Sequence, residues 1–404
     1  MTHRVVITGA GTVNALGHDV PATRAAMREG RCAIGPLDIR DADRLQSPIG
    51  AQVRDWRAED RFSLRDIALY DRVTQFTVEA ARQAVAQSGL AFAGALAGQT
   101  GVVLGTAGGG LGTVDDNYRA VYEDRKDRVH PLVVPRLMNS AGVSHLSMIH
   151  GLRGPSFSVS TACASSNHAM ALAFQMVQSG MAPVMLTGGA EAMLCFGGLK
   201  AWEGLRVMAR DACRPFSKGR NGMVQGEGAA VFIFENRDHA LARGAAVLAE
   251  VIGFGMTSDA SDIVMPSQDG AVACMRQALA AARIAPADVG YINAHGTGTA
   301  ANDRVESAAI AQIFGPNPPP VSSTKSMHGH VIGGTGAVEL LACLMALQEG
   351  VLAPTVGWLG QDDDCLTDVV ANHARTAEVD VAMSNAFAFG GLSAVLVLRR
   401  AGAH

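Results

Sequence analysis

Short apolar runs and longer stretches with helical spacing alternate along this chain. The apolar runs end in glycines or small polar residues and occupy positions 4–11, 100–110, 157–161, 183–189, 289–299, 321–330 and 392–400. Runs of this length predict strands. Helical spacing lies between them, at about 21–29, 71–88, 164–179, 302–314 and 334–349. Strands that alternate with helices predict an α/β fold built in layers.

The second half of the chain repeats the order of the first, with strand, glycine-rich loop and helix following one another. This repetition predicts an internal duplication, although the residues of the two halves differ. No linker, low-complexity tract or short-period repeat separates the halves. We therefore expect them to form one compact body.

Composition narrows the class of protein. The 404 residues are 48% hydrophobic and 17% charged, with a formal net charge of −4. A nucleic-acid-binding protein would show a concentrated basic surface, and this chain gives no sign of one. No apolar stretch approaches the roughly 18–20 residues of a membrane span, and the N-terminal residues lack the pattern of a signal peptide. The seven scattered cysteines therefore predict reduced thiols in a cytoplasmic protein.

Gly9 and Gly11 imitate a dinucleotide-binding fingerprint. The third glycine position of that motif holds Asn14, and no clear acidic residue ends a second strand about 20 residues later. We interpret the two glycines as turn residues that follow a short strand.

Cys163 differs from the other cysteines in its setting. Cys274 and Cys343 occupy apolar positions of predicted helices and should be buried. Cys163 lies where a predicted strand turns into a helix, and a helix N-terminus favours a thiolate, the nucleophilic form of cysteine. It is either a nucleophile or a small buried apolar residue.

Two histidines are candidate partners for Cys163. His295 and His330 each follow a predicted strand, in what we take as equivalent positions of a repeat, where α/β sheets gather functional side chains. Either could instead be a core histidine. His168 follows Cys163 by five residues, which places it roughly 140° around a helix, so it should face away. A metal site formed by His328, His330 and Cys163 is a rival, but no carboxylate or second cysteine has a familiar ligand spacing.

Four motifs together resemble one family. They are GLRGPSFSVSTACASS (151–166), NAHGTGT (293–299), SSTKSMHGH (322–330) and NAFAFGG (385–391). In this order they are similar to the β-ketoacyl-acyl-carrier-protein synthases of type II, elongating members of the thiolase-fold condensing enzymes. The segments 199–217, 261–267 and 323–330 look most like the nodulation-E-type synthases, which elongate unusual, often polyunsaturated acyl chains. The resemblance extends from the first predicted strand to the last.

The resemblance implies a fold and a reaction. The fold would be five-layered, αβαβα, with residues 1–250 carrying the nucleophile and residues 251–404 carrying both catalytic histidines. Cys163 would hold an acyl group, and neutral His295 and His330 would donate N–H bonds to a malonyl thioester oxygen during a decarboxylative Claisen condensation. The amides of Cys163 and Phe389 would form the oxyanion hole.

Other residues take roles only through the resemblance. Lys325 would keep His330 neutral, supported by an ion pair with Glu339. Thr297 and Thr299 would contact a phosphopantetheine arm, and Phe389, followed by Gly390, would be a gate for the acyl chain. No metal or diffusible cofactor is implied, because the phosphopantetheine arrives on the acyl carrier protein.

The implied partners are acyl carrier proteins loaded with acyl and malonyl groups, and a second ketosynthase-like subunit. The second subunit could be a copy of this chain or a homologue of chain-length factors. Carrier proteins are acidic, so a basic rim is expected at the tunnel mouth. Arg65, Arg128 and Arg206 are compatible with that rim, although any one of them could be an ordinary solvated arginine.

Three departures from the family pattern concern the acyl channel. Gly108 stands where a bulky residue is common, which should make room for a long, rigid or branched acyl group. Ala388 replaces glycine before the gate and should stiffen the loop, since alanine is poor at positive φ. Leu392 and Ser393 replace the usual Thr and Asn behind the gate and leave its polar support in doubt. These departures favour a specialised acyl pathway over housekeeping fatty-acid elongation, which is the alternative.

The same residues distinguish a ketosynthase from three other classes of protein. A chain-length factor lacks the nucleophile, whereas Cys163, His295 and His330 are all present. The chain could still be a ketosynthase that pairs with such a factor. A thiolase needs a second cysteine late in the chain, and the corresponding segment 385–391 contains none. A scaffolding protein would not need the three candidate catalytic residues.

Overall fold

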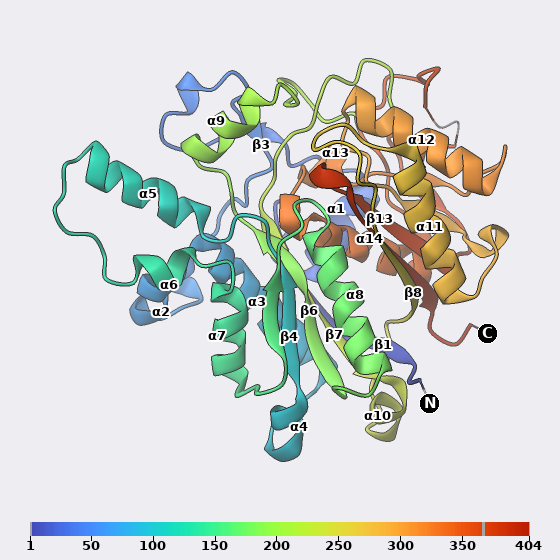
Figure 1. Ribbon diagram of the computed structural model, residues 1–404, viewed down its shortest axis with the longest axis horizontal. Helices are drawn as coiled ribbons and strands as arrows, with labels where there is room; N and C mark the ends of the chain where they lie inside the picture. Colours follow the sequence, from blue (N-terminus) through green and yellow to red (C-terminus); the bar gives the residue numbers. More distant parts are fainter. Residues whose placement is uncertain (1, 366–367, 404) are drawn as a thin grey trace.

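The computed structural model describes residues 2–365 and 368–403. Its largest element is a ten-stranded mixed sheet (Figure 1). The strands follow in the order β5 (Ser156–Val159), β4 (Gly101–Gly105), β6 (Val184–Glu191), β7 (Gly228–Asn236), β1 (Val5–Asn14), β8 (Ala249–Ser258), β14 (Leu392–Arg400), β13 (Val381–Phe387), β9 (Tyr291–Asn293) and β10 (Val321–Ser322).

The sheet consists of two matching halves. In the first, β5, β4 and β6 run parallel, while β7 and β1 complete it in antiparallel fashion. In the second, β10, β9 and β13 run parallel, and β14 and β8 complete it in the same way. A short antiparallel ladder between β1 and β8 joins them, with Val5 opposite Val251. The strand orders match, which agrees with the predicted duplication.

Helices complete the five layers. The outer layers contain α3 (Arg72–Ser88), which packs on β1 and β7, and α11 (Gln268–Ala282), which packs on β8 and β14. The middle layer contains α8 (Ser165–Gln178) and α14 (Thr335–Glu349), which contact each other and strands of both halves. The predicted αβαβα arrangement is therefore confirmed.

The position of each helix in the layers explains its composition. The helix α3 is apolar on one face only; Asp71 caps its first turn by accepting a hydrogen bond from the Val73 amide, and Gly89 ends it at φ +67°. The helix α14 is buried from Thr335 to Leu347, because it lies between the two halves of the sheet and contacts strands of both. A helix that is apolar all round belongs in a protein interior. Cys274 and Cys343 are fully buried, as predicted.

Gly9 and Gly11 correct one prediction. The strand β1 continues through both glycines to Asn14, so they are not turn residues. A Cβ atom at Gly9 would lie 2.1 Å from the Ala84 carbonyl oxygen, and one at Gly11 would lie 2.0 Å from that of Ala80. The glycines therefore allow α3 to approach the strand closely.

The remaining elements lie around these layers. The other helices are α1 (Val20–Glu29), α2 (Leu64–Leu69), α4 (Gly94–Gln99), α5 (Leu111–Tyr122), α6 (Val133–Leu137), α7 (Ala141–His150), α9 (Phe196–Gly204), α10 (Arg237–Ala242), α12 (Ala300–Phe314) and α13 (Lys325–His328). The short strands are β2 (Gly35–Pro36), β3 (Ile49–Gly50), β11 (Val351–Leu352) and β12 (Arg375–Thr376). Within the described ranges, no helix combines the length and hydrophobicity needed to cross a bilayer.

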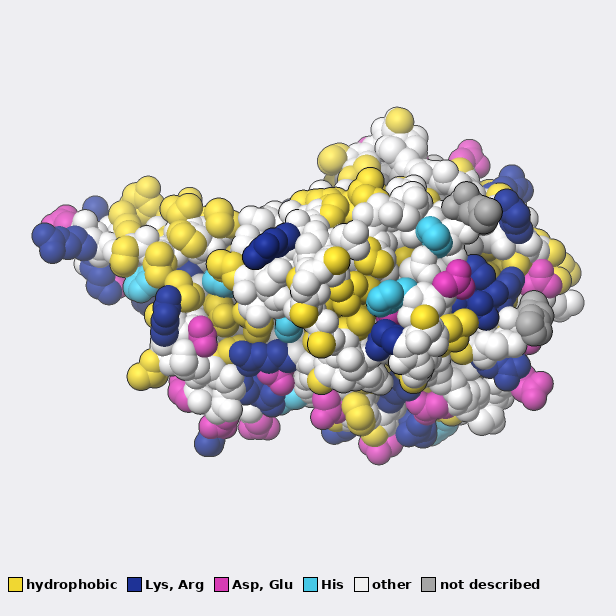
Figure 2. All heavy atoms as spheres, turned by 90° about the horizontal axis from the view of Figure 1, so that it is seen from below, with side chains coloured by type: hydrophobic (Ala, Val, Ile, Leu, Met, Phe, Trp, Pro, Cys, Tyr) yellow, Lys and Arg dark blue, Asp and Glu magenta, His cyan; other side chains and the backbone are white. Residues whose placement is uncertain are grey.

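The segment with α5 and α6 projects from the body as an arm, at the left of Figures 1 and 2. Large apolar side chains are exposed along it and on the neighbouring α7 and β5. They are Tyr118, Tyr122, Val129, Val134, Met138, Met148, Ile149 and Phe157. An exposed apolar surface of this kind is typical of a contact with another protein.

Candidate active site

The candidate catalytic residues all follow strands that run parallel within their half of the sheet. Cys163 follows β5, His295 follows β9, His330 follows β10 and Phe389 follows β13. The carboxyl ends of such strands are where α/β folds collect functional side chains. One correction concerns the repeat. His330 and Cys163 occupy matching places in the two halves, each between an edge strand and a central helix, whereas His295 matches the loop after β4.

A tight turn positions Cys163 at the start of α8. Ala162 has φ +46°, which is unusual for a residue with a Cβ atom. The Ser165 hydroxyl fixes the turn, because it accepts from the Thr161 amide at 2.8 Å and donates to the Ala162 carbonyl at 2.6 Å. Backbone strain of this kind is often found at functional sites.

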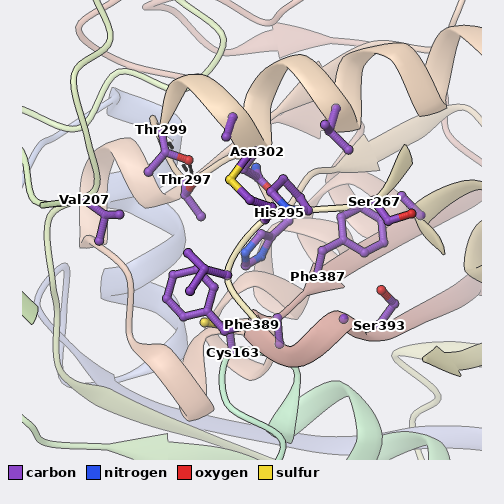
Figure 3. Close-up of a pocket in the computed structure, with 18 of the residues that line it drawn as sticks. Cys163, Val207, Ser267, His295, Thr297, Thr299, Asn302, Phe387, Phe389 and Ser393 are labelled. Carbon is purple, nitrogen blue, oxygen red and sulfur yellow. Dashed lines mark hydrogen bonds between the residues drawn. The ribbon is translucent and has the colours of Figure 1, made fainter. Parts of the chain in front are cut away.

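Cys163, His295 and His330 meet in one cavity. The sulfur and one nitrogen from each ring lie within 4.8 Å of one another. The imidazole rings are nearly perpendicular, with centroids 5.5 Å apart. Figure 3 shows His295 and Phe389 beside Cys163 in this cavity, with Thr297 and Thr299 farther along its wall. The structure thus brings together residues that are 132 and 167 positions away from Cys163 in the chain (295 − 163 and 330 − 163).

The hydrogen bonds of His330 determine what its ring offers. Its Nδ1 accepts a hydrogen bond from the Ile332 amide at 3.0 Å, so the proton of a neutral ring must be on Nε2. This Nε2 is buried and has no hydrogen-bond partner among the described residues. The ring of His330 therefore presents an unpaired N–H donor to the cavity.

Both rings are held in the neutral form. Burial lowers the pKa of His295 and of His330 well below the ordinary value, and the positive charge of Lys325 lowers both further. Lys325 is fully buried; its ammonium donates to Glu339 at 2.6 Å and to the His295 carbonyl at 2.5 Å. The ion pair that the sequence analysis expected between Lys325 and Glu339 is present.

The protonation state of Cys163 differs from the expectation. Burial raises the pKa of the thiol to about 12, while the charge of Lys325 and the amide of Cys163 itself act in the opposite direction. The desolvation of a thiolate outweighs the helix N-terminus here. The resting sulfur is therefore a thiol, and the expectation of a thiolate was wrong for this state.

Two carboxylates of α12 hold the loop that carries His295. Glu306 accepts from the amides of His295 at 2.8 Å and Gly296 at 2.7 Å. Asp303 accepts from the amides of Phe216 at 2.8 Å and Thr297 at 3.1 Å. Neither residue was predicted from the sequence, because their burial and their backbone partners depend on the fold.

Glu191 is a second supporting residue that the sequence analysis missed. It is fully buried at the end of β6, and its carboxylate accepts from the amides of Ala107 at 2.7 Å, Gly108 at 3.1 Å and Gly333 at 3.1 Å. Gly333 follows His330 by three residues. Burial raises the pKa of Glu191 to about 7. One carboxylate therefore connects the loop after β4 with the loop of His330.

The remaining predicted residues include three that line the cavity. Thr297, Thr299 and Phe389 line the cavity, and the hydroxyls of Thr297 and Thr299 are 2.8 Å apart. Gly390, at φ +80°, follows Phe389 directly. Trp202, which the sequence analysis did not single out, lines the same cavity.

Gly108 does not line this cavity. A Cβ atom at Gly108 would lie 3.2 Å from the Met193 side chain, so that methionine occupies the space that a larger residue would take. The room expected at Gly108 is therefore filled in this conformation, although a methionine side chain is flexible.

The two other departures concern Ala388, where the backbone angle matters, and Ser393, where burial matters. Ala388 has φ −108°, so alanine causes no strain there, and the expected stiffening through positive φ is wrong. The positive φ angles of this loop belong to Gly390 and Gly391. Ser393 is buried in β14 and lines the cavity, so one polar group remains behind Phe389.

The three candidate docking arginines are exposed. Arg65 lies in α2, Arg128 between α5 and α6, and Arg206 after α9, next to Val207, which lines the cavity. Arg206 therefore lies close to the cavity, while the other two lie on or near the arm.

The histidines that the sequence analysis set aside are occupied elsewhere. His168 bonds to Thr161 through its Nδ1, and both ring nitrogens of His328 are bonded to neighbouring groups. Among the described residues, the cluster whose geometry could bind a metal is Cys163, His295 and His330, and the predicted set with His328 is not brought together. The positive charge of Lys325, which lowers the pKa of both rings, also opposes a second cation there.

Comparison with known proteins gives a consistent picture. The family model for the N-terminal domain of β-ketoacyl synthases matches residues 2–240, and that for the C-terminal domain matches residues 248–358. Nodulation protein E of Rhizobium sp. (strain N33) is 45% identical over 402 residues, 99% of this chain and 100% of that protein. The 3-oxoacyl-[acyl-carrier-protein] synthase 2 of Coxiella burnetii (strain RSA 493 / Nine Mile phase I) is 37% identical and covers 98% of each chain. Among solved structures, the ishigamide ketosynthase/chain length factor has a TM-score of 0.95 at 32% identity, with all of both chains covered.

Proposed function

The chain belongs to the β-ketoacyl synthase family of condensing acyltransferases, and we propose that it extends an acyl group held on Cys163 by two carbons from malonyl-acyl carrier protein. The family resemblance seen in the sequence is thereby confirmed. The observation that carries the proposal is the meeting of the Cys163 thiol with two neutral imidazoles, one of which presents an unpaired N–H.

The first half-reaction loads the enzyme. The sulfur of Cys163 attacks the carbonyl carbon of an acyl thioester on the carrier protein, and the new S–C bond replaces the bond to the pantetheine sulfur. The thiol proton leaves with that sulfur, so the carrier protein departs with a free thiol. The amides of Cys163 and Phe389 would stabilise the oxyanion of the tetrahedral intermediate.

The second half-reaction forms the carbon–carbon bond. The malonyl carboxylate leaves as carbon dioxide, and its bonding electrons move to the thioester oxygen as an enolate. The N–H groups of His330 and His295 would stabilise this charge, which is why neutral rings suit the step. The enolate carbon then attacks the acyl carbonyl, and Cys163 leaves as a thiolate that takes up a proton.

Thr297 and Thr299 suit the role of pantetheine contacts, because they line the cavity beyond the catalytic residues. No diffusible cofactor or metal is needed for these steps. Arg206 supports docking of an acidic carrier protein through its exposed charge beside the cavity. Arg65 and Arg128 are proposed for the same surface.

A specialised acyl substrate is favoured over housekeeping elongation. The supporting observations are Gly108, beside which the flexible side chain of Met193 lies, and the 45% identity to a nodulation protein E. Housekeeping elongation is the second candidate, supported by the synthase 2 of Coxiella burnetii. Turnover of a series of acyl chains that differ in length and unsaturation distinguishes the two.

A second subunit fits the exposed apolar arm. Tyr118, Tyr122 and Val134 are 57%, 68% and 63% exposed, and burial against a ketosynthase-like partner would remove them from water. The partner would be a copy of this chain or a homologue of chain-length factors, as in the ishigamide ketosynthase/chain length factor. The mass of the purified protein in solution, alone and with such a homologue, tests this. We expect the enzyme to act in the cytoplasm.

The deciding experiment uses acyl- and malonyl-loaded carrier protein with the wild type and Cys163→Ala. The wild type should become acylated at Cys163 and release a β-ketoacyl product. Cys163→Ala should lose acylation and condensation but still release carbon dioxide from malonyl-carrier protein, because the histidines remain. A wild-type enzyme that is never acylated at Cys163 contradicts the proposal.

A further inference from the structure

Trp202 lies in the active-site cavity but takes no part in the steps proposed above. It comes from α9 in the first half of the chain, while Phe389 comes from the end of β13 in the second. Their rings are stacked, with centroids 5.9 Å apart and planes 26° from parallel. Both residues line the cavity that contains Cys163.

The two sides of this stack differ in their freedom to move. On the side of Phe389, Gly390 and Gly391 follow at φ +80° and +69°, and such glycines can absorb large changes of backbone angle. Three backbone bonds hold this loop. The Ala388 amide donates to the Leu392 carbonyl, the Gly390 amide to the Ile263 carbonyl, and the Asp259 amide to the Gly391 carbonyl. Figure 3 shows the Phe389 ring beside Cys163. An acyl group on the sulfur would therefore compete with this ring for space.

On the other side, α9 is fixed. Glu203, next to Trp202, accepts hydrogen bonds from the amides of Gln46 and Ser47 and forms an ion pair with Lys200 at 2.8 Å. The guanidinium of Arg44 lies 4.5 Å from the centre of the Phe196 ring at the start of α9. Trp202 is therefore presented by an anchored helix, and the backbone next to Phe389 is the more adaptable side of the stack.

We propose that Trp202 is a positioning residue that holds Phe389 in the closed position by ring stacking until an acyl group forms on Cys163. This proposal rests on the proposed function, since it assigns Trp202 to the acylation step. Opening the gate requires separation of the rings, and an aromatic pair is worth about a two- to tenfold factor in an equilibrium constant beyond its buried area. The stack therefore sets how readily the cavity admits an acyl chain and how well it protects the thiol before loading.

Fluorescence provides a direct test. The chain has three tryptophans, and Trp56→Phe/Trp358→Phe leaves Trp202 as the single emitter. On addition of acyl-carrier protein, the emission of Trp202 should change at the rate at which mass spectrometry finds Cys163 acylated. The same protein with Cys163→Ala should show no such change. If Cys163 becomes acylated while the emission stays constant, the stack does not open and the inference fails; if no acylation occurs, the proposed function fails instead.

Substitution tests the energetic role. Trp202→Leu should increase the rate of Cys163 alkylation by iodoacetamide about two- to tenfold, as measured at the Cys163 peptide, because the stack is lost. Trp202→Phe keeps an aromatic partner and should stay within about twofold of the wild type. In Trp202→Leu/Phe389→Leu the effects should not add, because both changes remove the same interaction.

The matched control is Trp56→Leu, which removes a tryptophan in edge-to-face contact with Phe76 outside the cavity. It should lower the melting temperature without changing the alkylation rate of Cys163. If Trp202→Leu and Trp56→Leu change stability alike and leave alkylation at the wild-type rate, Trp202 only fills space and the inference is overturned.

Discussion

In the first half of the molecule the strand order is β5-β4-β6-β7-β1, and in the second half β10-β9-β13-β14-β8 has the same order and directions. The loop between the edge strand and the central helix carries Cys163 in one half and His330 in the other. The architecture thus fixes where a functional side chain stands, while each half supplies different chemistry. In the proposed reaction, the first half provides the nucleophile, and the second provides both N–H donors and their buried charge.

The halves also share a packing device. In β1, Gly9 and Gly11 lie against the backbone of α3, and in β8, Gly253 and Gly255 lie against α11. A Cβ atom at Gly255 would lie 2.1 Å from the Cys274 carbonyl oxygen, much as one at Gly11 would lie 2.0 Å from that of Ala80. The first half differs in carrying the α5–α6 arm, which exposes large apolar side chains, and α9, which carries Trp202.

The largest expected effect concerns the buried charge of the second half. Lys325→Met leaves the Glu339 carboxylate unpaired in the core, which should destabilise the fold by about 3–5 kcal/mol. Lys325→Met/Glu339→Leu should regain most of this, because the pair is replaced by apolar groups. Denaturant unfolding measures both. Equal stability of the single and double variants would show that the pair is not the cause.

The division of chemistry between the halves is tested by the histidines. His330→Ala should lower malonyl decarboxylation about 10²–10³-fold, the usual loss on removing one oxyanion donor, while Cys163 is still acylated. Assays with labelled malonyl- and acyl-carrier protein separate the two steps, and His168→Ala, outside the cavity, is the control. An equal loss of acylation would mean that the halves do not divide the work in this way.

Glu191 ties a loop of the first half to a loop of the second and should make stability depend on pH. Its pKa is raised to about 7 by burial, so its contribution is fully present below the unfolded value of 4.5 and is lost as the pH rises through about 7. At about 1.4 kcal/mol per pKa unit, the loss is roughly 3 kcal/mol. In Glu191→Gln, this decrease of the unfolding free energy between about pH 4 and pH 8 should be absent. An unchanged profile would place the titration on other groups.

The smallest expected effect tests the shared packing device. Gly11→Ala and Gly255→Ala should each destabilise the protein by about 1–3 kcal/mol, as overpacking does, because α3 and α11 must move outward. Gly98→Ala, which meets open space in α4, is the matched control and should have little effect. If only one of the two changes were destabilising, the packing of the halves would not be equivalent.

The sequence alone predicted seven of the ten strands of the large sheet, without β7, β8 and β13, together with the family and the residues expected to carry the chemistry. Period and stop signals are local, which is why α3 begins and ends within a residue of its prediction. Motifs of a few residues were enough to single out Cys163, His295 and His330. The same local patterns misread Gly9 and Gly11, since a close approach by a helix some 70 residues away leaves no mark in the strand itself.

Only the tertiary structure decided how these residues work. It placed the His330 ring with its proton on Nε2, raised the pKa of the Cys163 thiol, filled the space at Gly108 with Met193, and stacked Trp202 on Phe389. Glu191, Asp303 and Glu306 became visible as supports only when their backbone partners were known. Each of these depends on desolvation or contact between segments far apart in the chain, and no single segment contains that information.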